Sequence, residues 1–310
     1  MSEIRSLMAA ELAKPVNPRV SLMAAALAAE YREAARAVLF YGSCLRESQL
    51  DGLMLDFYLI VSDYEAAYGK GWYAYANRLL PPNVFPFAHK DAGGELVAKY
   101  AVLSEADFAR LCSTEAGDVS VWARFAQPTR LVWYTDSRAR TIIEYAVSEA
   151  PVTLFQYTLP MMPPYQDIST LEIWKTGFGL TYSAELRAER AGRSLSVVDA
   201  DPDRYRLIGE ATLDEIKNRM GVGPNGEVPL FVSDVQARKI WSRFRRKGKA
   251  LTLARLAKAT TTYAGGIDYI AWKINRHAGT EIAVKDWQRK WPIIGAITML
   301  PKLFKSGAIK

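Results

Sequence analysis

Cysteine, histidine and long hydrophobic runs are all scarce in this sequence of 310 residues. Cys44 and Cys112 are too few for a disulfide framework, and no cysteine–histidine cluster has the spacing of a zinc site. Two histidines also disfavour a mechanism or a metal centre built on histidine. The apolar stretch Pro292–Leu300 is about half of the roughly 18 residues that span a bilayer. We therefore expect an intracellular protein that is either soluble or bound to a membrane surface.

Positive charge is concentrated towards the C-terminus. Residues 236–310 contain 17 Lys and Arg against 3 Asp and Glu, whereas residues 1–235 contain 23 against 30. The net charge of +7 thus combines an acidic body with a basic tail region. Hydrophobic residues make up 50% and charged residues 24%, which is an ordinary globular composition and excludes disordered, collagen-like and coiled-coil classes.

The hydrophobic pattern predicts an α/β fold in the first half of the chain. Short apolar runs bounded by turn residues indicate strands, and longer stretches rich in Ala or with alternating charge indicate helices. We expect helices over 20–36, 64–80, 104–111 and 136–149, and strands over 37–41, 53–61, 84–89, 96–103 and 130–134, with a hairpin turn at 91–94.

The domain organisation follows from changes in composition. Four prolines at 151, 160, 163 and 164 indicate a linker-like stretch after the α/β part. We expect an α/β domain over residues 1–150 and a mainly helical domain over 151–260, with a winged-helix arrangement as one alternative. Residues 261–310, which mix Trp, Ile, Leu and Phe with Lys and Arg, are expected to form a basic amphipathic segment.

One segment in the α/β part carries candidate chemistry. Gly42-Ser43 follows a predicted strand, and this dipeptide offers a turn without a Cβ, exposed backbone N–H groups and a hydroxyl, which together suit a phosphate. Asp56 lies inside the next, otherwise apolar strand, where an ionised carboxylate is costly unless it meets a cation. Nucleotidyltransferases use this layout, with the triphosphate at Gly-Ser and Mg²⁺ at the strand carboxylate.

The same residues have an ordinary structural interpretation. Gly42-Ser43 can be a simple turn, and Asp56 can pair with a structural Arg. Nucleotidyltransferases commonly carry two carboxylates two residues apart on this strand, but Met54 and Tyr58 occupy those positions here. A second metal ligand must then come from Asp51, Asp63 or a later strand.

In its order of motifs the sequence resembles the mitochondrial-type CDP-diacylglycerol synthases, which are phosphatidate cytidylyltransferases of the translocator-maintenance family and also occur in bacteria. The family's two histidines after the Trp are absent here, and Ala184 replaces a glycine. The resemblance covers roughly residues 30–275, and the matching residues are Tyr41-Gly42-Ser43, Met54-Leu55-Asp56-Phe57, Asp63, Trp72, Lys99-Tyr100-Ala101-Val102-Leu103-Ser104, the segment 179–187, Tyr205-Arg206, Tyr263-Ala264-Gly265, Tyr269 and Lys273.

The resemblance implies a polymerase-beta-like nucleotidyltransferase fold, with CTP and phosphatidic acid as substrates and Mg²⁺ as the cofactor. The implied products are CDP-diacylglycerol and pyrophosphate, and a homodimer is one compatible assembly. The implied catalytic residues are Ser43, Asp56 and Lys99. The implied nucleotide-binding residues are Gly42, Ser43, Lys99, Tyr182 and Arg187. The implied metal ligands are Asp56 with Asp51 or Asp63.

The basic tail region has three interpretations: a solvated helix, a nucleic-acid patch, or a surface for anionic lipids. Trp and aliphatic residues interleaved with Lys and Arg in the last 25 residues favour the lipid surface and disfavour nucleic acid. The membrane-binding candidates are Arg245, Arg246, Lys247, Trp287, Trp291, Lys302 and Phe304.

The main hypothesis is therefore a cytidylyltransferase bound to the cytoplasmic face of a bacterial inner membrane. The first alternative is a nucleic-acid-binding protein or a nucleotidyltransferase acting on RNA, with the basic helix 236–258 as its contact surface. The second alternative is a catalytically inactive scaffold with the same fold, since the paired-carboxylate motif is incomplete.

Overall fold

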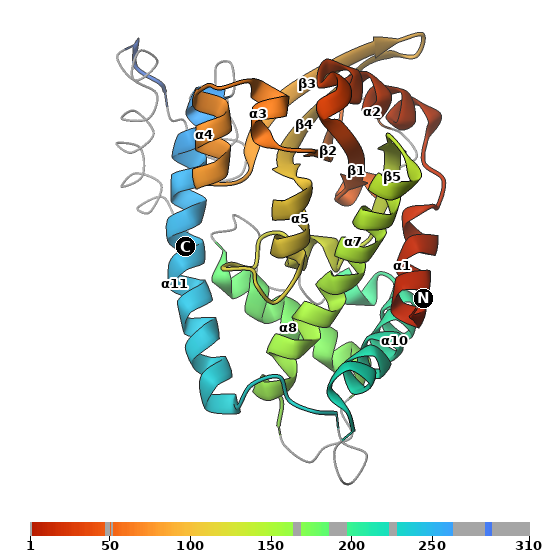
Figure 1. Cartoon of the computed structure of the whole chain (residues 1–310), viewed down its shortest axis with the longest axis vertical. Coiled ribbons are helices and arrows are strands. Elements are labelled where there is room, and N and C mark those ends of the chain that lie inside the picture. The colour runs from red at the N-terminus through yellow and green to blue at the C-terminus, as the bar shows by residue number, and fades with distance from the viewer. Residues whose placement is uncertain are drawn as a thin grey trace.

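The structure is a computed structural model that describes residues 2–46, 50, 52–163, 169–185, 197–222, 228–262 and 283–286. A five-stranded mixed sheet lies at one end of the molecule, and a thick layer of helices extends from one of its faces (Figure 1). The expected α/β class is confirmed.

The sheet has the strand order β3-β4-β2-β1-β5. All neighbouring strands are antiparallel except β2 and β4, which are parallel and therefore bring together residues separated by a long connection. The strands are β1 (Ala35–Tyr41), β2 (Met54–Val61), β3 (Asn83–Asp91), β4 (Gly94–Ser104) and β5 (Thr129–Tyr134).

The helices cover both faces of this sheet. Short 3-10 helices occur at Arg32–Ala34, Ser43–Arg46 and Leu159–Met161. The α-helices are α1 (Glu3–Leu12), α2 (Pro18–Glu30), α3 (Tyr64–Tyr68), α4 (Trp72–Leu79), α5 (Glu105–Cys112), α6 (Trp122–Phe125), α7 (Ser137–Thr158), α8 (Thr170–Ala184), α10 (Pro202–Met220) and α11 (Asp234–Thr262).

The alternation of side chains along the strands creates two cores, one on each face. Phe57 and Leu59 of β2 point into the smaller core, which α2 and the start of α4 cover. Tyr58 and Ile60 point into the larger core, which is filled by side chains from α1, α5, α6, α7, α8, α10 and α11. Asp56 lies on the same face of β2 as Tyr58, so its carboxylate belongs to the side covered by the larger helical layer.

The expected boundary at residue 150 falls inside α7, which continues through Pro151 to Thr158. The prediction that Pro151 belongs to a linker is wrong, because the helix is buried on nearly all sides along this part and its packing holds it together. The larger core also contains residues from both predicted domains, so they pack as one body. Within the part of 151–260 that the structure describes there are helices only, and thus no strand for a winged-helix wing.

Two further features complete the fold. Helix α1, which the sequence pattern did not lead us to expect, packs against α7 and α10 (Figure 1). In the described part of the chain, no helix is both long and apolar enough to cross a lipid bilayer.

Candidate functional site

The candidate site begins at the turn that ends β1. Gly42 adopts φ +93°, a backbone conformation that favours glycine, and a Cβ at this position would lie 3.1 Å from Oδ2 of Asp56. Ser43 follows as the first residue of a short 3-10 helix, and its side chain is exposed. Because Gly42 has no side chain, the Asp56 carboxylate can approach the backbone of the turn.

Asp56 is positioned by its two neighbouring strands. On β1 its partner is Tyr41, which places the carboxylate beside the Gly42 turn. On β4 its partner is Lys99, and the Lys99 Nζ lies 3.1 Å from Asp56 Oδ1. The side chains of Asp56 and Lys99 are 20% and 32% exposed, so both can still reach a bound ligand.

The Lys99–Asp56 ion pair identifies the cation that meets the Asp56 carboxylate. A structural Arg was one interpretation, but the partner in the structure is the lysine that the resemblance assigns to phosphate binding. Both groups point to the same face of the sheet, because paired residues on parallel strands share a face. The sequence-predicted residues Gly42, Ser43, Asp56 and Lys99 thus lie together at one end of the sheet.

Arg124 of α6 is a further cation on this face, which the sequence analysis missed. Its guanidinium donates a hydrogen bond of 2.9 Å to the Tyr58 hydroxyl and lies 5.3 Å from the ring centroid of Tyr41. Burial alone would lower the pKa of Arg124, but its neighbours Tyr58, Tyr41 and Glu185 outweigh burial and hold that pKa above its ordinary value. Glu185 is the residue that follows α8.

Asp63 has a different role from the one predicted. It is the N-cap of α3, and its carboxylate accepts hydrogen bonds of 2.8 and 2.9 Å from the backbone N–H groups of Glu65 and Ala66. At about 3.3 Å per strand residue, the seven steps from Asp56 to Asp63 correspond to roughly 20 Å. The prediction that Asp63 shares a metal ion with Asp56 is therefore wrong.

Other predicted site residues lie in different settings. Tyr182 is on α8, partly buried against the larger core. Arg245, Arg246 and Lys247 are exposed on α11. The remaining candidates lie outside the described residues: Asp51, Arg187, Trp287, Trp291, Lys302 and Phe304.

Helix α11 separates its basic residues into two groups. Arg245, Arg246 and Lys247 are exposed, and the Lys247 Nζ lies close to Gly117 in the loop before α6, while Trp241 and Phe244 are buried in the larger core. Nearer the end of the helix, Arg255 donates hydrogen bonds to the Pro81 carbonyl, Ser120 and Asp118. Lys258 contacts the carbonyls of the same turn, and burial together with the Arg255 charge lowers the pKa of Lys258 to about 7.

These contacts hold α11 to the sheet and to the loop before α6. Burial would raise the pKa of Asp118, but the Arg255 charge and the hydrogen bonds from Ser120 lower it below its usual value. The Ser120 carbonyl also accepts a hydrogen bond of 3.3 Å from Arg124. A continuous polar network therefore runs from α11 through this loop to the face that carries Asp56.

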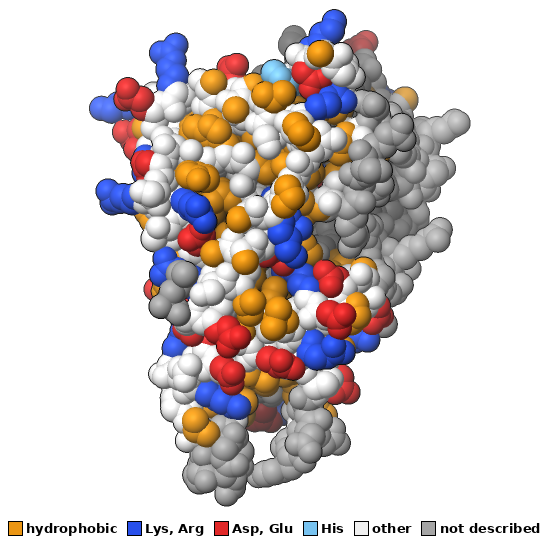
Figure 2. All heavy atoms as spheres, turned by 90° about the vertical axis from the view of Figure 1, so that its right-hand side faces the viewer, with side chains coloured by type: hydrophobic (Ala, Val, Ile, Leu, Met, Phe, Trp, Pro, Cys, Tyr) orange, Lys and Arg blue, Asp and Glu red, His pale blue; other side chains and the backbone are white. Residues whose placement is uncertain are grey.

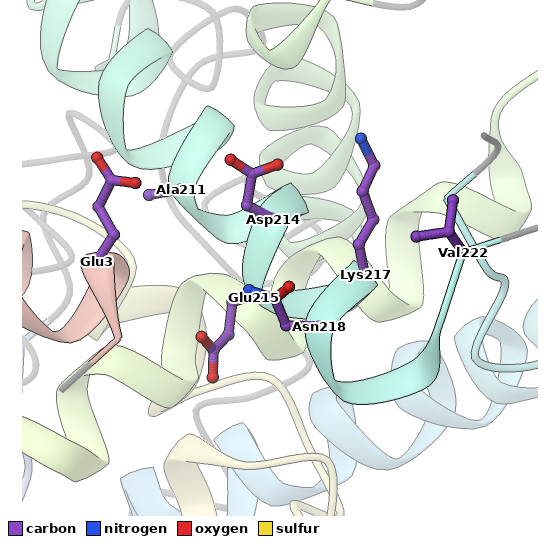
Figure 3. A pocket seen from close by; sticks show the side chains of 7 residues that line it. All are labelled: Glu3, Ala211, Asp214, Glu215, Lys217, Asn218 and Val222. Atoms are coloured by element: carbon purple, nitrogen blue, oxygen red, sulfur yellow. The ribbon is translucent and has the colours of Figure 1, made fainter.

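A cavity elsewhere on the molecule contains none of these residues. It has a volume of about 340 Å³ and lies between the start of α1 and the end of α10. The Glu215 side chain points away from those of Asp214 and Lys217, so its carboxylate does not converge with theirs (Figure 3). Glu215 instead pairs with Arg219, which also binds Glu149, and this arrangement is structural.

Asp56 is the residue of this site that could bind a Mg²⁺ ion. Among the residues that the structure describes, no group of three or more His, Cys, Asp or Glu side chains could hold a metal on its own. Mg²⁺ commonly uses only one or two carboxylates and takes its other ligands from water and substrate phosphates. The Asp56 carboxylate, next to a turn without a Cβ, fits such a shared site.

Comparisons with known proteins do not identify the chain: no protein-family model matches it, and no curated protein matches it either.

Proposed function

We propose that this protein is a Mg²⁺-dependent nucleotidyltransferase that joins CTP and phosphatidic acid to give CDP-diacylglycerol and pyrophosphate. The observation that carries the proposal is the meeting of three elements at one end of the sheet: the Gly42 turn, the Asp56 carboxylate and the Lys99 ammonium group. The choice of CTP and of a lipid phosphate rests on the resemblance of the motifs around these residues.

Each residue has a role in this proposal. The backbone of Gly42 and the hydroxyl of Ser43 bind oxygens of the triphosphate, and Lys99 neutralises a phosphate charge. Asp56 would hold the Mg²⁺, which when bound neutralises charge on the triphosphate oxygens. Arg124 keeps its positive charge beneath the same face of the sheet and adds to the attraction for anions.

The reaction does not require a histidine. A phosphate oxygen of phosphatidic acid is already anionic at neutral pH, so it can attack the α-phosphorus of CTP without a general base. A new P–O bond forms at the α-phosphorus while its bond to the bridging oxygen breaks, and pyrophosphate leaves with that electron pair. The protein's contribution is then to place the two phosphates in line and to balance their charge.

A lipid acceptor requires contact with a membrane, and the proposed location is the cytoplasmic face of a bacterial inner membrane. The exposed residues Arg245, Arg246 and Lys247 would favour anionic headgroups. The RNA-directed alternative receives less support, because Trp241 and Phe244, the aromatic residues of α11, are buried and cannot stack on bases.

The experiment that tests the proposal uses the purified full chain, Mg²⁺ and liposomes that contain phosphatidic acid. Each of the four NTPs, labelled at the α-phosphate, is supplied separately, and lipid labelling and pyrophosphate release are followed. We expect equal amounts of both products with CTP and much less with the other three nucleotides. Absence of lipid labelling with every nucleotide would overturn the proposal, and labelling of added RNA would favour the alternative.

A further inference from the structure

Helix α4 is packed in the opposite sense to an ordinary surface helix. Its buried residues are small or polar: Ala74 and Ala76 are each 3% exposed, and Asn77 is fully buried. Its large apolar residues point outward, with Trp72 and Tyr75 each 58% exposed and Leu79 71% exposed (these three form the α4 stripe). Since burying large apolar side chains stabilises a fold, a helix that exposes all three has another use for them.

The α4 stripe is continuous and held firmly in place. Its members are spaced three and four residues apart, which puts them on one side of a helix, and the rings of Trp72 and Tyr75 lie 6.1 Å apart. On the opposite side of the helix, the Asn77 side chain donates a hydrogen bond of 2.9 Å to the Val102 carbonyl of β4. The backbone N–H of Asn83 donates to the Asn77 side-chain oxygen. The sheet therefore fixes the direction in which the α4 stripe points.

The size and chemistry of the α4 stripe favour a lipid surface over a protein partner. Three side chains of this size expose on the order of 400 Å², about half of the roughly 800 Å² per partner in a stable protein interface. A membrane requires no matching patch, and Trp and Tyr favour the headgroup level of a bilayer. Lys70, which is exposed just before α4, adds positive charge suited to anionic headgroups, whereas Arg78 is paired with Glu65.

The two sides of the molecule differ in charge, and the α4 stripe lies on the side of the basic helix α11. Helices α4 and α11 lie along the same side of the molecule (Figure 1), and α11 carries exposed basic residues. On the other side, acidic side chains gather in the lower half of the face (Figure 2). The helices α1 and α10 lie there and expose Glu3, Asp203, Glu210 and Asp214.

From these observations we infer that the α4 stripe is a membrane-contacting surface that inserts Trp72, Tyr75 and Leu79 into the headgroup region of an anionic bilayer. The inference deepens the proposed function, on which it rests for the lipid nature of the acceptor. It assigns membrane contact to a rigid helix of the α/β part, in addition to the exposed basic residues of α11.

The test measures binding to vesicles of phosphatidylcholine and phosphatidylglycerol by co-sedimentation, without nucleotide or Mg²⁺. The variant Trp72→Ser/Tyr75→Ser/Leu79→Ser should bind at least about tenfold more weakly than the unaltered protein, because it removes most of the apolar area of the stripe. Its circular dichroism spectrum and melting temperature should change little, since all three side chains are exposed.

A matched control replaces three residues of similar exposure on other helices: Leu22→Ser/Tyr145→Ser/Leu207→Ser, which are 57%, 49% and 49% exposed. The control should bind vesicles like the unaltered protein. Equal binding by the stripe variant, or an equal loss in both variants, would overturn the inference. Unchanged vesicle binding with loss of self-association in sedimentation velocity would identify the stripe as a contact between two copies of the chain instead.

Membrane contact and cytidylyl transfer can be measured separately. Transfer to a water-soluble, short-chain phosphatidic acid does not depend on a membrane, so the stripe variant should retain it. If the unaltered protein shows no transfer but its vesicle binding depends on the stripe, the surface stands and the enzymatic proposal falls. If transfer occurs and the stripe variant binds vesicles like the unaltered protein, the enzymatic proposal stands and the membrane-contacting surface falls.

Discussion

Replacing Gly42 with alanine tests whether the turn after β1 positions Asp56. Gly42 has φ +93°, so an alanine there costs about 1–3 kcal/mol in backbone strain. The added Cβ would also lie 3.1 Å from Asp56 Oδ2, which is closer than such atoms normally approach, so the carboxylate must move by a few tenths of an ångström. We therefore expect both a loss of stability and a displacement of the proposed metal ligand.

The matched control is Gly69→Ala, because Gly69 has φ +70° and no atom within 4 Å of the added Cβ. Urea unfolding should show similar losses of about 1–3 kcal/mol for both variants, since both strain the backbone. Only Gly42→Ala should also lose cytidylyl transfer, with kcat/KM at least about tenfold lower, or ~1.4 kcal/mol of transition-state stabilisation. Equal kcat/KM in the two variants would show that the turn is not part of the site.

Two further predictions concern buried ion pairs. Arg255→Leu should lower the free energy of unfolding by roughly 2–3 kcal/mol, because it leaves the carboxylate of Asp118 buried without its cation. The control Arg238→Leu, on the exposed part of α11, should change the free energy of unfolding by less than about 0.5 kcal/mol. Similar urea midpoints for the two variants would contradict this prediction. Burial would raise the pKa of Glu11, but its hydrogen bonds and charge pairing with Arg204 lower it. The stabilising contribution of Glu11 is therefore present above the ordinary pKa of about 4.5 and is lost as pH falls below it. In a plot of the free energy of unfolding against pH, Glu11→Gln should thus show a shallower decrease at acidic pH than the unaltered protein. An unchanged decrease would count against the Glu11–Arg204 pair.

Local sequence patterns were sufficient for much of the sheet. The apolar runs that predicted strands over 37–41 and 53–61 correspond to β1 and β2, and the turn at 91–94 joins β3 to β4 as expected. Ser104, the first residue of the predicted helix 104–111, accepts a hydrogen bond from the backbone N–H of Asp107 and caps α5. These features depend on residues within a few positions of each other, which is why the sequence alone indicates them.

Contacts between distant segments were not predictable in the same way. The pairing of Lys99 with Asp56 depends on β4 lying parallel to β2, and no local pattern indicates which strands become neighbours. Arg124 belongs to a short helix without a recognisable motif, so its approach to Tyr58 appears only in the folded chain. Pro151 usually ends or kinks a helix, but the packing around α7 outweighs that local preference.

The most direct test of the central claim is the rate of cytidylyl transfer by Asp56→Asn compared with Asp63→Asn. Both changes remove one negative charge from a residue of β2 or its end, and Asn can still cap α3 at position 63. We expect that Asp56→Asn lowers kcat/KM by roughly 100-fold or more while the fold is kept, and that Asp63→Asn leaves it within about twofold. Near-normal transfer by a folded Asp56→Asn variant would contradict the assignment of the site.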